Sequence, residues 1–290
     1  MTYSEIWHRI ATSYDDGEAR AIARILIEEL FGLSYTDIVC GATEQLSADD
    51  TLRLDTAVRR IEQGEPLQHV LGYADFCGNR FCVNGSVLIP RPETEWLVDE
   101  GAKLMSTTAT SSTKRILDIG TGSGCIAISL KLRLGDAYVE AWDISEEALR
   151  TAQDNADALK AEVVFRKRDA LRADNTAALW DLIVSNPPYI CNSERSAMDD
   201  NVLLHEPHTA LFVPDDDPLR FYRAIARYAL LTLNIGGSLL FECNTRYAEA
   251  TGKMLSDMGF EEVTVSDDCF SLPRFVRGSS PSQPSPSGRA

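Results

Sequence analysis

The sequence predicts an α/β protein in which a doubly wound, mostly parallel sheet follows a small helical domain. From residue 115 onward, short apolar runs alternate with helical patterns, as a parallel sheet covered by helices requires. The apolar run at residues 116–119 leads into a glycine-rich turn and then into a helix with an apolar face. Residues 1–70, by contrast, read as helices.

The helical domain is expected over residues 1–70. Apolar side chains recur at helical spacing over residues 21–31, and Gly32 is a natural C-cap because glycine tolerates the left-handed conformation. A second helix is expected over residues 51–63, where Gly64 ends it. Two helices with defined ends thus precede the first predicted strand.

A β-hairpin linker is expected over residues 71–93. Residues 73–88 alternate apolar and polar side chains around two glycine-containing turns, which predicts short paired strands. Two prolines then stiffen the approach to a helix over residues 94–105. The Ser- and Thr-rich run at residues 106–113 is low in complexity and is expected to be a surface loop.

The larger domain is expected over residues 94–278. Its later strands are predicted at residues 138–142, 163–165, 182–185, 238–243, 262–266 and 274–277, the last of them as the C-terminal edge strand. Residues 279–290 are rich in Ser, Pro and Gly, which is typical of a disordered tail.

Gly120, Gly122 and Gly124 form a turn that suits close approach of a ligand to the backbone, and the helix after it offers free N–H groups. The alternate spacing differs from the dinucleotide fingerprint G-x-G-x-x-G, and Asp118 just before the turn would be awkward beside a pyrophosphate. A cationic or zwitterionic ligand tolerates that carboxylate. Asp143 ends the next apolar strand about 20 residues further on, where an acid can accept hydrogen bonds from both ribose hydroxyls.

The tetrapeptide Asn186-Pro187-Pro188-Tyr189 follows the apolar run at residues 182–184. Neither proline has an N–H, so what remains is a rim of acceptors made of carbonyl oxygens and the Asn186 side-chain oxygen. A planar –NH2 group, whose two hydrogens need two acceptors, fits such a rim. The rim therefore indicates a side-chain amide or an exocyclic base amine as the group that is bound. A rigid strand-to-loop corner is the structural alternative, and the glycine turn earlier in the chain favours the chemical one.

The chain resembles a class I S-adenosylmethionine-dependent methyltransferase, because a glycine turn, an acid placed to bind ribose hydroxyls and Asn-Pro-Pro-Tyr follow one another in this order. Residues 65–72, 88–95 and 205–212 are similar to segments of the HemK/PrmC protein-(glutamine-N5) methyltransferases, and the resemblance extends over roughly residues 26–278. It implies a Rossmann-like fold with a mostly parallel seven-stranded sheet. The chain departs from the family at residues 267–274, where the family's usual turn before its last strand is replaced.

The resemblance implies S-adenosyl-L-methionine as cofactor, S-adenosyl-L-homocysteine as product, and class 1 peptide chain release factors as protein substrates, modified at the glutamine of their Gly-Gly-Gln motif. The helical domain over residues 1–70 would help to hold the substrate. The residues implied in cofactor binding are Asp118, Gly120, Thr121, Gly122, Ser123, Gly124, Asp143, Asp169, Ala170 and Asn186. Those implied in substrate binding are Asn186, Pro187, Pro188 and Tyr189.

Methyl transfer requires chiefly that the nucleophile be held in line with the activated methyl group. If Asn186 Oδ1 and the Pro187 carbonyl each accept one amide hydrogen, the glutamine nitrogen faces the methyl group, and positive charge developing on nitrogen is stabilised. Tyr189 would form a wall against the flat amide, or else it only packs the loop. Asn186, Pro187 and Tyr189 are therefore the predicted catalytic residues. An ordinary turn aspartate is the alternative for Asp169.

Arg91, Glu93 and Glu242 have open roles. Arg91 and Glu93 lie in a segment that the resemblance places near the cofactor, with a salt-bridged corner as the alternative. Glu242 ends a predicted strand at the edge where ligands of such sheets bind. His205 and His208 lack a third ligand at suitable spacing, so no metal is expected.

The net charge is −16, from 28 Lys and Arg against 44 Asp and Glu. Duplex binding needs a basic stripe, and the densest basic cluster is Arg166-Lys167-Arg168, so free DNA is not expected as a partner. An acidic enzyme attracts a basic protein surface instead, which release factors can present. Methylation of a flipped-out exocyclic amine in DNA or RNA is the second hypothesis. A non-catalytic binding module is the third, and the intact motifs argue against it.

The chain shows no signal peptide and no apolar run near the roughly 20 residues that span a bilayer. We therefore expect a cytoplasmic protein with no membrane partner, acting as a monomer.

Overall fold

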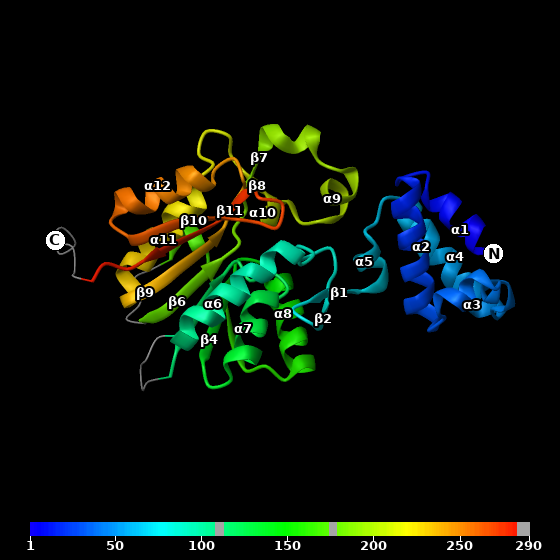
Figure 1. Cartoon of the computed structure of the whole chain (residues 1–290), viewed down its shortest axis with the longest axis horizontal. Helices are drawn as coiled ribbons and strands as arrows, with labels where there is room; N and C mark the ends of the chain where they lie inside the picture. Colours follow the sequence, from blue (N-terminus) through cyan, green and yellow to red (C-terminus); the bar gives the residue numbers. More distant parts are fainter. Residues whose placement is uncertain (108–112, 174–178, 283–290) are drawn as a thin grey trace. The chain divides into compact units, whose positions relative to one another are not determined.

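The computed structural model describes residues 1–107, 113–173 and 179–282 (Figure 1). These residues divide into two compact units. The smaller unit consists of Met1–Tyr73 and Met198–Glu206, and the larger unit consists of Ala74–Ala197 and Pro207–Ala290. The domain limits drawn from the sequence stay predictions, but the second stretch of the smaller unit is a feature that no sequence pattern indicated.

The smaller unit is built from helices whose ends are fixed by caps. Thr2 begins the first helix with a capping box to Glu5, and the Asp15 carboxylate caps the second by accepting from two backbone N–H groups. Gly32 ends the second helix in the left-handed conformation at φ 66°, which confirms the predicted C-cap. The helices are α1 (Tyr3–Ile10), α2 (Asp16–Phe31), α3 (Tyr35–Val39), η1 (Ala42–Gln45), α4 (Ala48–Glu62), α5 (Leu67–Leu71) and α9 (Asp200–His205).

Strands β1 (Tyr73–Phe76) and β2 (Asn79–Cys82) form a two-stranded hairpin. Cys77 and Gly78, at φ 48° and 74°, form the two-residue turn that such hairpins favour. Paired strands are therefore present where the alternation predicted them. The predicted extent over residues 73–88 is too long, because pairing ends with β2.

The larger unit contains a seven-stranded sheet in the order β10-β11-β9-β6-β3-β4-β5 (Figure 1). Strands from β9 to β5 run parallel, and β11 runs antiparallel to both β9 and β10. The predicted doubly wound, mostly parallel sheet is confirmed. The expected edge position of the last strand is wrong, because β11 inserts between β9 and β10. The strands are β3 (Arg115–Ile119), β4 (Tyr138–Asp143), β5 (Val163–Lys167), β6 (Trp180–Ser185), β9 (Leu233–Glu242), β10 (Glu261–Asp267) and β11 (Pro273–Ser279).

Successive residues of the central strands point into two separate cores. Leu182 and Leu240 pack into the core beneath α6, α7 and α8, whereas Ile183 and Leu239 pack into the core beneath α11 and α12 (Figure 1). Because both faces are covered, the central strands are apolar throughout, which explains their uninterrupted runs. The helices are α6 (Glu95–Thr107), α7 (Cys125–Leu134), α8 (Glu146–Leu159), α11 (Arg220–Thr232) and α12 (Ala248–Met258).

Short elements occupy the connections of the larger unit. Two of them, β7 and β8, pair in parallel outside the main sheet. Their bounds and those of the other short elements are η2 (Pro92–Thr94), η3 (Ala170–Arg172), β7 (Ile190–Cys191), η4 (Asn192–Ala197), α10 (His208–Leu211) and β8 (Phe212–Val213).

Helix α6 continues into the predicted loop at residues 106–113. Ser106 and Thr107 are its last residues, and they donate their hydroxyls to the carbonyls of Ala102 and Lys103, at 2.8 and 3.2 Å. Residues 108–112 lie outside the described part of the chain. None of the helices described combines the length and the apolarity that crossing a membrane requires.

The chain after β11 stays bonded to the sheet. Ser280 donates its backbone N–H to the carbonyl of Gly237 at 2.8 Å and its hydroxyl to the carbonyl of Asn234 at 2.5 Å. The predicted tail over residues 279–290 therefore begins too early, since composition does not reveal which serines find partners. Residues 283–290 lie outside the described residues.

Asn155 on α8 connects the hairpin to the glycine turn. Its buried side chain accepts from the N–H of Cys82 at 2.6 Å and donates to the carbonyls of Cys82 and Ser123, at 3.0 and 2.9 Å. Three backbone groups on two segments thus depend on one side chain.

Replacing Asn155 with Ala should lower the free energy of unfolding by roughly 2–4 kcal/mol, because it leaves buried backbone groups without partners. Gln153→Ala is the matched control, since this exposed side chain on the same helix bonds only Asp157. That control should change stability by at most about 0.5 kcal/mol. Urea denaturation measures both, and equal losses would contradict the linking role of Asn155.

Candidate functional site

A cavity of about 360 Å³ opens at the carboxyl ends of β3, β4 and β6 in the larger unit. It is lined by the glycine turn, the strand ends and the loop after β6. The predicted site residues that line it are Gly120, Gly122, Asp143, Asp169, Ala170, Asn186, Pro187 and Pro188. The predicted site residues outside the lining are Asp118, Thr121, Ser123, Gly124 and Tyr189.

The glycine turn presents bare backbone to the cavity. Gly120 and Gly122 have φ values of 78° and 54°, a region that L side chains rarely adopt. A Cβ atom on Gly122 would meet no other atom within 4 Å. The carbonyl of Trp142 accepts from the N–H groups of Gly120 and Thr121, at 2.8 and 2.9 Å, and so holds the turn against the end of β4. The turn therefore leaves room for a ligand directly against its backbone.

Gly124 serves packing instead. A Cβ atom there would lie 2.9 Å from Ile128 Cδ1 and 3.1 Å from Ala152 Cβ. Ile128 belongs to α7 and Ala152 to α8, so glycine lets these two helices meet at the end of the turn.

Asp118 is fully buried beside the turn. The hydroxyl of Thr121 donates to Asp118 Oδ2 at 2.6 Å. Burial raises the pKa of Asp118 to about 7, and the bond from Thr121 opposes only part of this rise. At neutral pH the protonated form of this carboxyl is therefore far more populated than it is in an exposed aspartate.

Asp143 ties the turn to the end of β4. Its Oδ2 accepts from the N–H of Gly122 and its Oδ1 from the N–H of Ser145, both at 2.9 Å. Burial raises the pKa of Asp143, and these two hydrogen bonds oppose the rise. The backbone N–H of Ile144 also donates to this carboxylate. The carboxylate lines the cavity and keeps acceptor capacity for a ligand hydroxyl.

Asn186, directly after β6, is oriented by a chain of polar groups. Its Nδ2 donates to Thr94 Oγ1 at 3.4 Å, and Thr94 Oγ1 donates to Glu242 Oε2 at 2.6 Å. Thr94 and Glu242 are both buried. Because the nitrogen end of the Asn186 amide is engaged with Thr94, its oxygen end is left as an acceptor.

Glu242 also accepts from the hydroxyl of Tyr189, at Oε1 and 3.2 Å. Burial raises the pKa of Glu242, and the Thr94 hydroxyl and the charge of Arg274 oppose this rise. Tyr189 packs against the core beneath α11 and α12. This contact supports the packing alternative for Tyr189, and its role as a wall against an amide stays a prediction.

Thr94 is the site residue that sequence reasoning missed. It ends η2, between the singled-out Glu93 and the start of α6. Its place in residues 88–95, a segment similar to the family, was the available signal. Neither Arg91 nor Glu93 lines the cavity, whereas Glu242 is now identified as the partner of Thr94.

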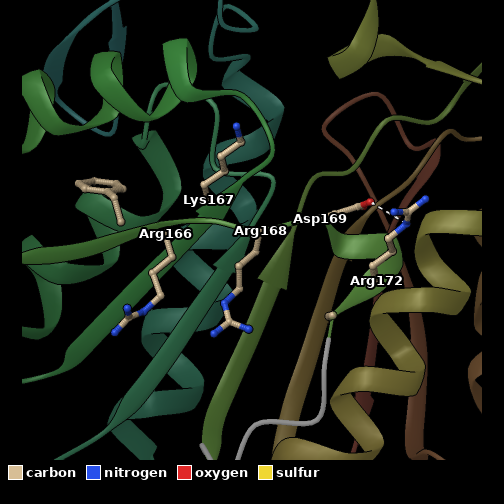
Figure 2. Close-up of a pocket in the computed structure, with 7 residues that line it drawn as sticks. Arg166, Lys167, Arg168, Asp169 and Arg172 are labelled. Carbon is tan, nitrogen blue, oxygen red and sulfur yellow. Dashed lines mark ion pairs between the residues drawn. The ribbon is translucent and has the colours of Figure 1, made fainter.

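The basic segment at the end of β5 borders the site. Arg168 and Asp169 line the cavity and also a second one of about 630 Å³ (Figure 2). Figure 2 shows Arg166 and Arg168 extending to one side and Lys167 to the other. The ion pairs here are Arg166–Glu140 at 2.9 Å, Lys167–Glu146 at 2.7 Å and Arg172–Asp169 at 3.7 Å. Acidic neighbours therefore offset most of the positive charge of this segment.

For Asp169 the sequence left two roles open, that of a cofactor-binding residue and that of a turn aspartate, and its surroundings in the structure are compatible with both. Its Oδ1 accepts from the N–H of Leu171 at 2.9 Å, so it caps η3 as a turn aspartate. It also lines the cavity, together with Ala170.

Within the described ranges, no group of three His, Cys, Asp or Glu side chains could hold a metal ion. His205 ends α9 in the smaller unit, and His208 begins α10 in the larger unit. His208 Nδ1 lies 3.4 Å from Arg195 Nη2.

Two family models match the chain. The model described as PrmC N-terminal domain matches residues 8–72, and the model described as Methyltransferase small domain matches residues 95–211. A Bacteroides thetaiotaomicron protein named release factor glutamine methyltransferase is 44% identical over 264 residues, which cover 91% of this chain and 93% of that protein. A protein of the same name from Flavobacterium psychrophilum is 38% identical over 272 residues, which cover 92% and 94%.

Solved methyltransferase structures share the fold. The hMettl16 catalytic domain, in complex with MAT2A 3'UTR hairpin 6, has a TM-score of 0.55 at 18% identity and covers 82% of this chain and 83% of its own. The delta-N METTL16 MTase domain has a TM-score of 0.53 at 20% identity and covers 76% and 96%. At these identities the likeness concerns the class I methyltransferase fold alone.

The Asp118→Asn variant should gain stability over the wild type as the pH rises. The pKa of Asp118 is about 7 in the folded protein and about 3.9 in an unfolded chain, so the folded state binds more protons between these values. This carboxyl therefore makes wild-type stability fall as the pH rises from about 4 through 7. The amide of Asn cannot ionise, yet it can accept the hydrogen bond from Thr121. Urea denaturation measures the free energy of unfolding of both proteins at pH 5 and pH 8. The free energy of the Asp118→Asn variant minus that of the wild type should be larger at pH 8 than at pH 5.

The control for this measurement is Asp136→Asn, at an exposed position after α7. It should keep the pH dependence of the wild type. A constant gap between the Asp118→Asn variant and the wild type would refute the buried, proton-binding state of Asp118.

Proposed function

This chain belongs to the release factor glutamine methyltransferase family, and we propose that it methylates the side-chain amide nitrogen (N5) of the glutamine in the Gly-Gly-Gln motif of class 1 peptide chain release factors. The methyl donor is S-adenosyl-L-methionine, the product is S-adenosyl-L-homocysteine, and the reaction supports translation termination. The observation that supports this proposal is that Asn186, Pro187 and Pro188 line the same cavity as Gly120 and Gly122, with the Asn186 nitrogen engaged by Thr94.

The residues of the cavity fit the proposed methyl donor. About 360 Å³ is within the range of small-molecule sites. The open space at Gly122 suits a ligand that lies against the backbone, and the Asp143 carboxylate keeps acceptor capacity for a ribose hydroxyl. The ionised form of Asp118, buried behind the glycine turn, would favour a cationic amino acid moiety on the cavity side of the turn. When bound, the donor supplies a methyl group activated by a sulfonium.

The acceptor rim suits a carboxamide nitrogen. Asn186 Oδ1 and the carbonyl of Pro187 each accept one of its two hydrogens, while Pro187 and Pro188 bring no N–H that would compete. The nitrogen forms its bond to carbon as the bond from sulfur to carbon breaks, and one proton then leaves to water. Asn186 and Pro187 stabilise the positive charge on nitrogen in between.

The charge of the molecule supports a protein substrate over free duplex DNA. The net charge is −16, and three of the cations at and just after the end of β5, Arg166, Lys167 and Arg172, are paired with Glu140, Glu146 and Asp169. The side chain of Arg168 lies over the ring of Trp142. Phosphate binding needs lysine and arginine that are free to replace counterions.

Methyl transfer from labelled S-adenosylmethionine to three substrates tests the proposal. The substrates are a full-length class 1 release factor, the same factor with the Gln of its Gly-Gly-Gln motif replaced by Ala, and unmethylated DNA. We expect label on the first substrate only. Asn186→Ala should reduce transfer by about 100-fold or more, because it removes a preorganised group that stabilises charge in the transition state. Label on DNA alone would instead establish the base-amine hypothesis.

The orientation of Asn186 through Thr94 gives a second prediction. Thr94→Val removes both the acceptor for Asn186 Nδ2 and the donor to Glu242, so kcat should fall roughly 10- to 100-fold. Thr94→Ser keeps the hydroxyl and should retain most of the wild-type kcat. Steady-state kinetics and the Kd for S-adenosylmethionine measure the two variants side by side.

This comparison separates orientation from folding. The Kd for S-adenosylmethionine should be similar in both variants, because Thr94 does not line the cavity. If Thr94→Val were as active as Thr94→Ser, the hydroxyl would not orient Asn186.

A further inference from the structure

Two large apolar side chains project from the turn between β10 and β11. Phe270 is 69% exposed and Leu272 is 45% exposed, and they are separated by one residue. The turn lies in the segment where the chain departs from the pattern of its family, between Asp267 and Pro273. Single exposed apolar residues are common on protein surfaces, so the meaning of this pair depends on how it is held and where it lies.

The turn is held in one conformation by Asp268. Its Oδ1 accepts from the backbone N–H groups of Phe270 and Leu272, at 2.9 and 3.1 Å, and its Oδ2 accepts from Arg274 Nε at 2.8 Å. The backbone N–H of Asp268 also donates to the carbonyl of Leu272 at 2.8 Å. Only 1% of the Asp268 side chain is exposed. A turn fixed in this way presents Phe270 and Leu272 to solvent without needing to be ordered by a partner, which favours binding.

The turn lies at the same edge of the sheet as the acceptor rim. Strand β11 runs antiparallel to β9, with Phe275 opposite Glu242, and the carbonyl of Arg274 accepts from the N–H of Cys243 at 2.7 Å. Strand β9 lies beside β6, whose end carries Asn186. The start of β11 is therefore close to Glu242, the buried carboxylate that holds Thr94 and through it orients Asn186.

We propose that Phe270 and Leu272 form a docking contact for the release factor domain that carries the acceptor glutamine. This proposal rests on the proposed function. An amide site recognises only the end of one side chain, so a protein substrate needs further apolar anchors around it. Two side chains are too little surface for a stable dimer of this chain, which requires about 800 Å² from each partner. Their apolar character also suits a protein surface and not a phosphate backbone.

The test compares two double variants in kinetics with a full-length release factor and saturating S-adenosylmethionine. Phe270→Ser with Leu272→Ser should raise the KM for the release factor by roughly tenfold, because truncating an aromatic anchor weakens binding. Its kcat should stay within about twofold, since neither residue lines the cavity. Phe270→Leu, which keeps an apolar side chain, should restore most of the affinity.

The matched control is Leu231→Ser with Ile235→Ser. Leu231 is 56% exposed and lies in the last turn of α11, and Ile235 is 74% exposed and lies near the amino end of β9, at the opposite edge of the sheet. The control should leave KM unchanged, and all variants should keep the wild-type Tm and Kd for S-adenosylmethionine.

Three results would overturn the docking contact. One is an unchanged KM in the Phe270 and Leu272 variant, and another is an equal rise in the control. The third is a fall in kcat with KM unchanged, which would place these residues in the chemical step. Absence of transfer by the wild-type protein is a separate result, because it would refute the proposed function itself.

Discussion

The acceptor site depends on one buried carboxylate. Glu242 receives two hydroxyl groups from separate loops, that of Thr94 before α6 and that of Tyr189 after β6. A buried carboxylate without such donors would be costly, and buried hydroxyls without an acceptor would be as well. The carboxylate and the two hydroxyls therefore require one another. The bond from Thr94 to Glu242 fixes the Thr94 hydroxyl, and that hydroxyl in turn orients Asn186.

The order of the parallel strands brings the site together. Gly120, Asp143, Asn186 and Glu242 follow or end four strands that neighbour one another in the sheet, β3, β4, β6 and β9. Each of these residues is at a carboxyl end, so their side chains and backbone meet at one edge. Both faces of the sheet are covered by helices, and this edge is where a ligand has access.

Local chemistry explains which parts of the site could be predicted from the sequence. The glycine turn and the Asn-Pro-Pro-Tyr segment carry their meaning within a few residues, and both border the cavity. The bond from Thr94 to Glu242 joins positions 148 residues apart, so it depends on a strand order that no local pattern contains. Gly124 has the same sequence signal as its neighbours, yet its role is set by Ala152 on another helix. Insertion of β11 between β9 and β10 likewise follows from pairing and not from composition.

The smaller unit is assembled from two stretches of chain, Met1–Tyr73 and Met198–Glu206. The backbone therefore passes between the units at three places, after residues 73, 197 and 206. A domain attached by a single linker can be exchanged between proteins by one recombination event. For this unit, a cut after residue 73 would leave α9 with the larger unit. Variants of the smaller unit that are made by truncation or grafting should therefore include Met198–Glu206 together with Met1–Tyr73.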